Sequence, residues 1–356
     1  MKLMRKSTNR KSVLRITLQS LPALLVAIVL IIYVVSFLPR STKQMQQGSA
    51  LIEYKSYYEL TVQGKPVAYF DSLTDSCMSE NITPQADSSI TRREFINGCW
   101  VSKYAFVPSC SGRILTTDPD SMAYKTIAEA NKNIEIVIKN TAEKLERSIK
   151  SLNKKEEELK YYLSVHNVSD DGYNTMAYLA GRLQKQMDQA KKALENIQKA
   201  ETAKQTSIKL VSKYTLVYRD TADKVVRIAC NAITPASKKP FRIIQTSDES
   251  TPDNASPTYL HQWLTPATGT SRDIIVASYP GCQLSMYDAD GAKAATFSSK
   301  ANGRGRHDVP PFLAPDGAAV YTSDGRMMGI SYKGNIISTR PVSYTHLRAH
   351  ETVLDL

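Results

Sequence analysis

The sequence predicts an α+β protein: an N-terminal transmembrane helix and an extracytoplasmic all-β, barrel-like domain that is interrupted by a long antiparallel coiled-coil hairpin. Three observations predict this layout. They are an uncharged apolar tract at residues 21–38, apolar residues at every seventh position in two segments between 120 and 210, and short alternating strands with turn signals on either side. The chain has 356 residues, of which 42% are hydrophobic and 22% are charged. This composition is near the globular average and excludes a wholly disordered or collagen-like chain.

A net charge of +12 could indicate a nucleic-acid partner, but the position of the basic residues in the chain argues against one. Eight Lys and Arg residues, and no Asp or Glu, lie within the first 44 residues, so much of the excess is confined to the N-terminus. A basic cluster beside an apolar tract is a signal of membrane topology. We therefore expect no nucleic-acid partner.

Residues 16–38 predict the transmembrane helix. The stretch 21–38 holds 18 uncharged residues, and about 20 apolar residues span the hydrocarbon core of a bilayer. A cleaved signal peptide would have a shorter apolar region and a small-x-small cleavage site, which this sequence lacks. The positive-inside rule puts residues 1–15 in the cytoplasm as a basic tail. The expected location is the inner (cytoplasmic) membrane, with a single pass and the main domain in the periplasm.

Five cysteines would then lie on the outer side of the membrane, where disulfides persist. Cys99 and Cys110 bracket a predicted hairpin and could form a bridge, and buried thiols are the alternative. The sequence has no CxxC pair and no Cys/His cluster, so it predicts no metal site. It also has no Gly-rich phosphate loop, and we expect no cofactor.

The segment 120–210 predicts the helical hairpin, with helices over 122–165 and 173–209. Apolar residues at every seventh position are typical of a coiled-coil seam. The intervening HNVSDDGY offers turn residues, and so short a linker folds the helices antiparallel. We expect an arm that contacts a protein partner or a second copy of the chain, and packing against its own domain is the alternative. The predicted seam residues are Ile138, Leu145, Leu152, Leu159, Met176, Leu183, Ala190 and Ile197.

The flanking segments, 45–118 and 211–340, predict β structure. YYELTVQGKPVAYFDSL (57–73) indicates two strands around a glycine turn, and Asp-Gly and Gly-Asn pairs punctuate the second segment. The last residues, 341–356, do not continue this pattern. They resemble the translated read-through of a sequencing-library adapter, so we predict an artefactual tail there.

Three stretches resemble the trypsin-like serine peptidases of the periplasmic stress-protease kind. They are AFVPSCSGRILTTD (105–118), DIIVASYPG (273–281) and LAPDGAAVYTSDGRMMGIS (313–331). The first is similar to the strand-turn-strand around the histidine of that family, and the third to its nucleophile loop. The resemblance implies a pair of β-barrels with a Ser-His-Asp triad and a backbone oxyanion hole.

Carried over onto this sequence, the resemblance implies a degenerate fold without the triad. The nucleophile position falls on Asp316, followed by Gly317, and a carboxylate cannot replace an activated serine hydroxyl. Asp118, Pro119 and Asp120 stand where the histidine is expected. We therefore expect a membrane-anchored scaffold or interaction protein that is not catalytic. An active trypsin-like serine peptidase is an alternative that needs a nucleophile and a base elsewhere.

The layout also resembles that of the membrane fusion (adaptor) proteins of efflux and secretion pumps, which split a lipoyl-like β-sandwich around a hairpin. SGRILTTD would be one half-motif, although the Gly-Asp-x-Val-Lys-x-Gly signature is absent. This alternative implies a periplasmic adaptor of an export system, with a transporter and an outer-membrane channel as partners. Strand pairing separates the two folds. Residues 99–117 pair within a barrel in the trypsin-like fold and with residues 211–230 in the split sandwich.

Overall fold

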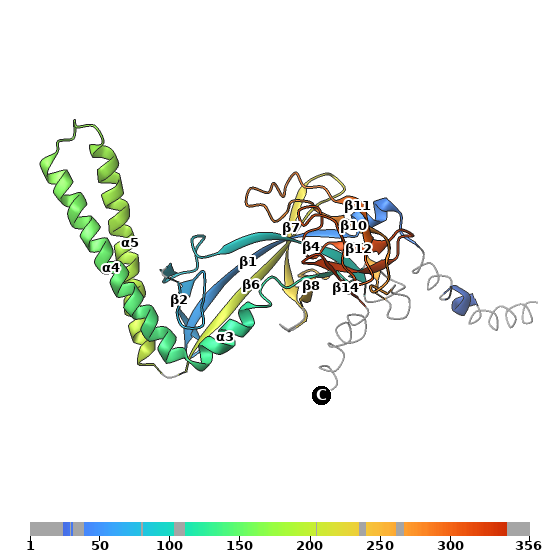
Figure 1. Cartoon of the computed structure of the whole chain (residues 1–356), viewed down its shortest axis with the longest axis horizontal. Helices are drawn as coiled ribbons and strands as arrows, with labels where there is room; N and C mark the ends of the chain where they lie inside the picture. Colours follow the sequence, from blue (N-terminus) through green and yellow to red (C-terminus); the bar gives the residue numbers. More distant parts are fainter. Residues whose placement is uncertain are drawn as a thin grey trace, which may run out of the picture.

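In the computed structural model the chain is mostly β, with two packed sheets at one end and a pair of long helices at the other (Figure 1). The structure describes residues 24–28, 30, 39–79, 81–102, 111–203, 205–234, 240–260 and 267–339.

The first sheet contains a closed six-stranded barrel. Its strand order is β3-β2-β1-β6-β7-β8-β5-β4-β9, and β4 also pairs with β1, which closes a ring of β1, β6, β7, β8, β5 and β4. Every pairing in this ring is antiparallel. The strands are β1 (Ser49–Val62), β2 (Lys65–Phe70), β3 (Ile82–Thr83), β4 (Arg92–Ser102), β5 (Arg113–Thr117), β6 (Thr206–Arg219), β7 (Val225–Ala232), β8 (Phe241–Thr246) and β9 (Thr258–Tyr259).

The second sheet has five strands in the order β11-β10-β12-β13-β14. Arg306 forms a bridge with Asn335, and His307 forms one with Ala301, so this segment connects the two edge strands. The strands are β10 (Arg272–Ser278), β11 (Ala295–Ala301), β12 (Ala319–Thr322), β13 (Met327–Tyr332) and β14 (Asn335–Ser338).

Apolar side chains fill the barrel and the space between the two sheets. Ile52, Tyr54 and Ile114 belong to the cluster inside the barrel. Another cluster includes Leu115 from β5 and Tyr321 from β12, so it joins the outer surface of the barrel to the second sheet. Burial of apolar surface is the dominant favourable contribution to folding, and the shared cluster makes the two sheets one packed unit.

β1 and β6 extend beyond the barrel. They pair continuously from Leu51 opposite Val217 to Val62 opposite Thr206. The inner half of β1, up to Ser56, also pairs with β4, whereas its outer half pairs with β2. The β1–β6 ribbon therefore leaves the barrel and reaches the base of the long helices (Figure 1).

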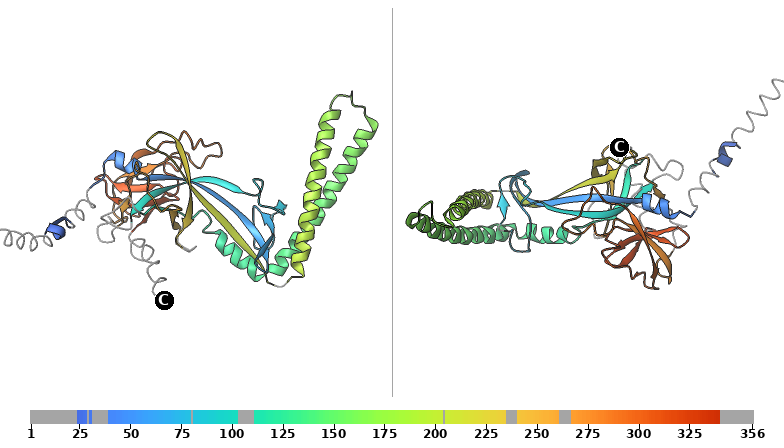
Figure 2. Two further views of the ribbon diagram at one scale, coloured as in Figure 1. Left: turned by 180° about the vertical axis from the view of Figure 1, so that it is seen from behind. Right: turned by 90° about the horizontal axis from the view of Figure 1, so that it is seen from above.

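α4 (Ile134–Val165) and α5 (Tyr173–Glu201) lie antiparallel and pack against each other. We call residues 134–201 the arm, and Figure 2 shows it at the end of the molecule opposite the second sheet. At its base, Ile138 and Ile197 share a buried cluster with Leu60 of β1 and Phe70 of β2. The short helices are α2 (Thr42–Gln47), before β1, and α3 (Ala123–Lys132), between β5 and the arm.

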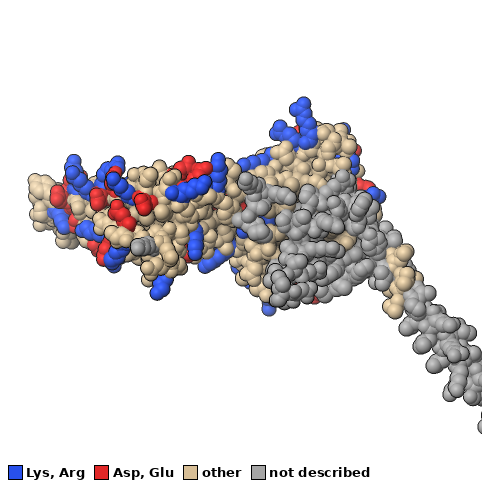
Figure 3. Space-filling model, turned by 90° about the horizontal axis from the view of Figure 1, so that it is seen from below, with Lys and Arg blue, Asp and Glu red and all other residues tan. Residues whose placement is uncertain are grey.

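The exposed surface of the arm carries both signs of charge. On the face seen in Figure 3, Lys and Arg are interspersed with Asp and Glu. Pairs four residues apart, such as Glu156 and Lys160 at 2.6 Å, lie along α4. A mixed surface of this kind is typical of a solvated helix face and not of a nucleic-acid-binding patch.

The prediction of a coiled-coil hairpin is wrong. Helices occupy the predicted segment, but no side chain in residues 146–165 of α4 or 173–186 of α5 is fully buried. The seven-residue pattern marks an apolar face, and the sheet covers this face at the base of the arm. The α+β prediction is corrected to a mostly β fold with a closed six-stranded barrel.

The prediction of a transmembrane helix is contradicted as well. Among the described residues, no helix has both the length and the apolar character needed to cross a bilayer. Only residues 24–28 and 30 of the apolar tract are described, and they are helical and exposed. The inner-membrane location, the periplasmic domain and the integral membrane partner depended on that helix and are corrected with it. The predicted tails, 1–15 and 341–356, lie outside the described residues.

The described part of residues 99–117 pairs within the barrel. β4 and β5 pair with each other, and β5 also pairs with β8. Neither strand pairs with residues 211–230 in the parts of the chain that the structure describes. The split sandwich of the adaptor proteins is therefore the wrong fold for this chain.

Ile138→Ala should lower the free energy of unfolding by about 2–5 kcal/mol, because it leaves a cavity in a packed core. Ile138 is 2% exposed, in the cluster that joins the arm to β1 and β2. Ile136→Ala removes the same atoms from the same helix at a side chain that is 56% exposed, and it should cost less than about 0.5 kcal/mol. Denaturant unfolding measures both. Equal effects would mean that the base of the arm is not packed on the sheet.

Candidate functional site

The predicted nucleophile loop forms the turn that leads into β12. The Asp316 carboxylate accepts a hydrogen bond from the backbone N–H of Lys333 at 2.7 Å. The N–H of Gly317 donates to the carbonyl oxygen of Ser331 at 2.8 Å. Burial raises the pKa of the Asp316 carboxyl, and this backbone hydrogen bond opposes the rise. The Asp316 carboxylate thus anchors its loop to the turn between β13 and β14.

Gly317 brings this loop against the barrel. Its φ is 89°, and a Cβ atom here would lie 2.0 Å from the carbonyl oxygen of Asn97 on β4. A residue with a side chain would strain the backbone and separate the loop from the barrel. The close approach of two backbones is therefore sufficient reason for a glycine at this position.

Asn97 connects the barrel to the turn after β10. Its Oδ1 accepts from the N–H of Tyr279 at 2.7 Å, and its Nδ2 donates to the Cys282 sulfur at 3.1 Å. Its carbonyl oxygen accepts from the Thr116 hydroxyl at 2.6 Å. Asn97 is fully buried, and buried polar groups left without partners cost about 1–3 kcal/mol each. The Asn97 side chain therefore links β4 of the barrel to the segment after β10 and holds the second sheet against the barrel.

A buried ion pair occupies the segment where the resemblance expects a histidine. Arg242 on β8 donates to Asp118 at 2.7 Å, and their side chains are 7% and 1% exposed. Arg242 also donates to the Tyr124 hydroxyl at 2.6 Å, and its guanidinium carbon lies 5.9 Å from the centre of the Tyr214 ring. The Arg242 guanidinium thus holds the turn that follows β5 through its contacts with Asp118 and Tyr124.

Asp120 lies beside this pair and is 4% exposed. Its Oδ2 atom has no hydrogen-bond partner, and Arg92 is 3.8 Å from the other carboxylate oxygen. Burial raises the pKa of Asp120 to about 6, although Arg242 acts in the opposite direction. Perturbed carboxyls often mark functional sites, but structural ion-pair clusters produce the same shift.

A serine and a histidine meet inside the second sheet. The Nε2 atom of His307 lies 2.9 Å from the Ser331 hydroxyl. Ser331 is 0% exposed, His307 is 6% exposed, and the Nδ1 atom of His307 has no hydrogen-bond partner. Burial lowers the pKa of His307, against the effect of Asp308. A general base in a triad is oriented by a carboxylate at Nδ1, which this histidine lacks.

The sequence does not reveal the pair of His307 and Ser331. His307 follows the polar run GRGR, which predicts a solvated loop, and Ser331 lies in an ordinary strand pattern. In the structure, bridges to Ala301 and Asn335 hold this segment between β11 and β14. A single histidine after a basic run is too weak a signal to predict its burial.

The other predicted residues lie apart from this region. Cys99 is fully buried, and burial raises the pKa of its thiol to about 12. Cys110 lies outside the described residues, so a bridge between the two stays a prediction. Of the seam residues, Ile138, Leu145 and Ile197 are buried at the base of the arm. The remaining seam residues, Leu152, Leu159, Met176, Leu183 and Ala190, are half-buried.

The described side chains include no group of three or more His, Cys, Asp or Glu that could hold a metal ion. The polar groups described above are backbone N–H donors, the carboxylates of Asp118, Asp120 and Asp316, the Arg242 guanidinium and one enclosed Ser–His pair. Chemically this set can hold loops together and accept hydrogen bonds.

A comparison with solved structures finds two to which this chain is similar. The protease domain of MamO from Magnetospirillum magneticum, in its apo form, has 7% identity and a TM-score of 0.31, covering 84% of this chain and 95% of that chain. Deg5 has 8% identity and a TM-score of 0.33, with coverages of 84% and 87%. At these scores the likeness transfers no activity. No protein-family model matches the chain, and no curated protein does.

His307→Gln should reduce the loss of stability that we expect when the pH falls from 7.5 to 5. The folded state holds His307 with a lowered pKa, so the unfolded chain binds its proton first as the pH falls, and the contribution of the neutral ring is lost below about pH 6.5. Asp120, with its raised pKa, has the opposite dependence, but it is present in both proteins and cancels in the comparison. Melting temperatures across this range provide the test. Parallel curves would show that His307 does not titrate on unfolding.

Proposed function

We propose that this chain is a non-catalytic scaffold or interaction protein on a trypsin-like β fold whose catalytic positions hold packing groups. The observation that carries the proposal is the environment of Asp316. At the nucleophile position this side chain is a carboxylate that accepts the N–H of Lys333, and it offers no hydroxyl to a substrate carbonyl.

The residues around the expected histidine support the same conclusion. Asp118 is held by Arg242, a guanidinium that stays protonated at physiological pH. A general base must accept a proton from the nucleophile, and neither partner of a closed ion pair is available to do so. The pair instead connects β8 to the start of α3 through Tyr124.

The enclosed Ser–His pair favours one competing function, a serine hydrolase that uses Ser331. A hydrogen bond of 2.9 Å to His307 is the geometry of an activated nucleophile. Burial opposes this function, because a substrate cannot reach a side chain that is 0% exposed. Ser331 is better explained as the partner that satisfies a buried imidazole.

The outer half of the arm supports the interaction role. Tyr161, Val165, Tyr178 and Leu179 are 41–71% exposed there. Leu159 and Met176 line a groove between α4 and α5 nearby. Exposed apolar side chains that form a patch are typical of contact sites, whereas single ones are ordinary.

A fluorophosphonate probe tests the non-catalytic part. The native protein should show no more labelling than a heat-denatured sample, and Ser331→Ala should give the same result, because no accessible hydroxyl is activated. Native labelling that disappears in the Ser331→Ala variant would overturn the proposal in favour of the hydrolase.

Photo-crosslinking in the native host tests the interaction part. A benzoylphenylalanine at position 161 or 178 should give the same protein adduct, since both side chains lie on the exposed outer arm. Position 192 lies on α5, like position 178, but nearer the base of the arm, and it is also exposed. It is the matched control and should give no protein adduct. Adducts that form equally from all three positions, or from none, would contradict a specific contact by the outer arm.

A further inference from the structure

Two hollows of about 640 and 580 Å³ lie along one side of the arm. Lys155 lines both of them, so they meet at this side chain and form one groove, which we call the arm groove. Its lining residues recur along α4 every three or four positions, singly or as neighbours, and this spacing puts them on one face of the helix. They are Asn140, Lys144, Arg147, Ser148, Ser151, Leu152, Lys155, Glu158, Leu159 and Tyr162.

The lower end of the arm groove, nearest the sheet, has a fixed wall. Cys77, from the segment between β2 and β3, lines the groove there. The backbone N–H of Met78 donates to the hydroxyl of Thr141 at 3.0 Å, and both residues are buried. The Asn140 amide donates to the carbonyl oxygen of Ser76, also at 3.0 Å. The shape of this end is therefore present before any partner binds.

The lower half of the arm groove is basic. Lys144, Arg147 and Lys155 line it, and none of its described lining residues is acidic. Arg147 lies 3.6 Å from Glu143, but both side chains are more than half exposed, and exposed pairs contribute little. Lys155 forms no ion pair with the residues that the structure describes. This half of the groove therefore favours an acidic ligand.

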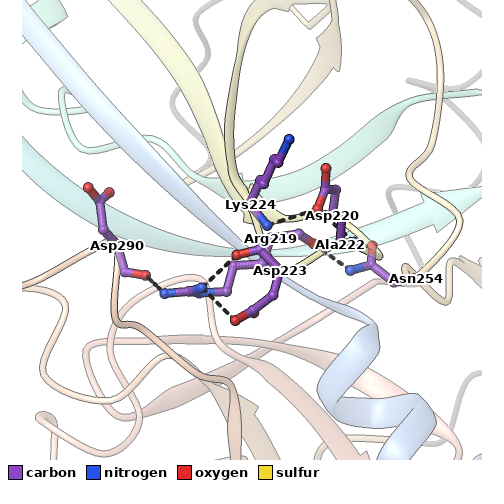
Figure 4. Close-up of polar contacts among 7 residues, drawn as sticks. All are labelled: Arg219, Asp220, Ala222, Asp223, Lys224, Asn254 and Asp290. Atoms are coloured by element: carbon purple, nitrogen blue, oxygen red, sulfur yellow. Dashed lines mark hydrogen bonds and ion pairs between the residues drawn. The ribbon is translucent and has the colours of Figure 1, made fainter.

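Cations at the junction of the two sheets, by contrast, are already engaged. Arg219 lies 3.0 Å from the Asp223 carboxylate, and its guanidinium also donates to the carbonyl oxygen of Asp290 (Figure 4). Arg227 pairs with the carboxylate of Asp290. An acidic partner would have to displace these contacts at the junction, whereas at Lys155 it displaces none.

The upper half of the arm groove, toward the loop at 166–172, is apolar and lies between the two helices. Both α4 and α5 contribute large apolar side chains to it, and all are half-buried or exposed. These side chains are Leu159, Tyr162, Met176, Leu179 and Leu183. An apolar groove between two helices is a surface on which a third helix packs.

We propose that the arm groove binds an amphipathic helix of a protein partner, with acidic residues beside the lower half and apolar residues beside the upper half. This inference rests on the interaction role proposed above and names the chemistry of the partner. From Asn140 to Tyr162 the groove is about 33 Å long, the length of a helix of about 22 residues. The apolar half provides affinity, and the basic half selects the direction of the bound helix.

A second copy of the chain is a poorer occupant of the arm groove. It would bring the same lining, in which Glu158 is the one carboxylate among the described residues. The cations of that lining are Lys144, Arg147, Lys155 and Arg182. Whichever way two such arms run, the basic half of each has no row of carboxylates opposite it. Charge complementarity therefore selects a segment rich in Asp or Glu.

Fluorescence anisotropy with a labelled synthetic peptide tests the proposal on the full chain. The peptide is a helix of about 22 residues, with leucines on one face of one half and glutamates on the same face of the other half, made in both orders. One order should bind saturably with a dissociation constant of about 100 μM or below. The matched peptide with lysine in place of glutamate should bind at least tenfold more weakly, because it meets like charges.

Charge reversal shows whether the groove causes this preference. Arg147→Glu combined with Lys155→Glu should weaken binding of the glutamate peptide at least tenfold and strengthen binding of the lysine peptide. Lys139→Glu combined with Lys150→Glu makes the same change of charge at exposed side chains on the opposite face of α4. This control should leave both affinities within about threefold at physiological salt. Leu179→Asp should weaken binding of both peptides, because it puts a charge in the apolar half.

Three results would overturn the proposal. They are equal binding of the two peptides, no binding of the glutamate peptide in either order, and equal effects of the groove and control charge reversals. Dimerisation in sedimentation that Leu179→Asp abolishes would instead assign the groove to a second copy of the chain.

Crosslinking from positions 161 and 178 separates this inference from the interaction role. Adducts that persist in the chain with Arg147→Glu and Lys155→Glu would keep the interaction role and reject the acidic partner. Absence of adducts from the unmodified chain would reject the interaction role itself.

Discussion

The antiparallel pairing of β1 with β6 is the interaction on which the rest of the structure depends. Between Leu51 and Val62, each residue of β1 has a partner on β6. The inner half of this ribbon closes the barrel through β4 and β7, and the outer half carries β2 and the base of the arm. The arm is inserted between β5 and β6, so the strand that returns from it must pair with β1 before the barrel can close. Because such non-local contacts carry a loop-closure cost, the packed base of the arm helps to offset it.

The buried polar groups between the strands suit packing better than chemistry. Asn97, Asp118 and Arg242 are all buried, and each has hydrogen bonds that connect separate strands or helices. A buried ion pair is a poor source of net stability, but it penalises arrangements that separate its members. The resulting protein has a body of two sheets that share an apolar cluster, with an arm at the far end. Such a body suits a scaffold, since a rigid connection fixes the distance between two contact sites.

Local features of this fold could be predicted from the sequence, and non-local features could not. The turn at Gly64 and the strands on either side follow from residue types alone and are confirmed by the pairing of β1 with β2. The assignment of Asp316 to a nucleophile position comes from a resemblance in sequence and stays a prediction. The heptad pattern identified an apolar helix face but not its covering, so a coiled coil was predicted where Ile138 packs on the sheet. The burial of His307 depends on contacts between segments far apart in the chain, for which periodicity carries no information.

Native-state hydrogen exchange along β1 tests the central claim most directly, namely that barrel and arm form one cooperative body. The account predicts that amides in the outer half of β1, residues 58–62, open with the same free energy as those in the inner half, residues 51–56, because one ribbon and two connected cores hold both. Outer amides that open at a much lower free energy while the barrel stays protected would contradict it. The arm would then be a loosely attached module, and a scaffold of fixed length would lose its structural basis.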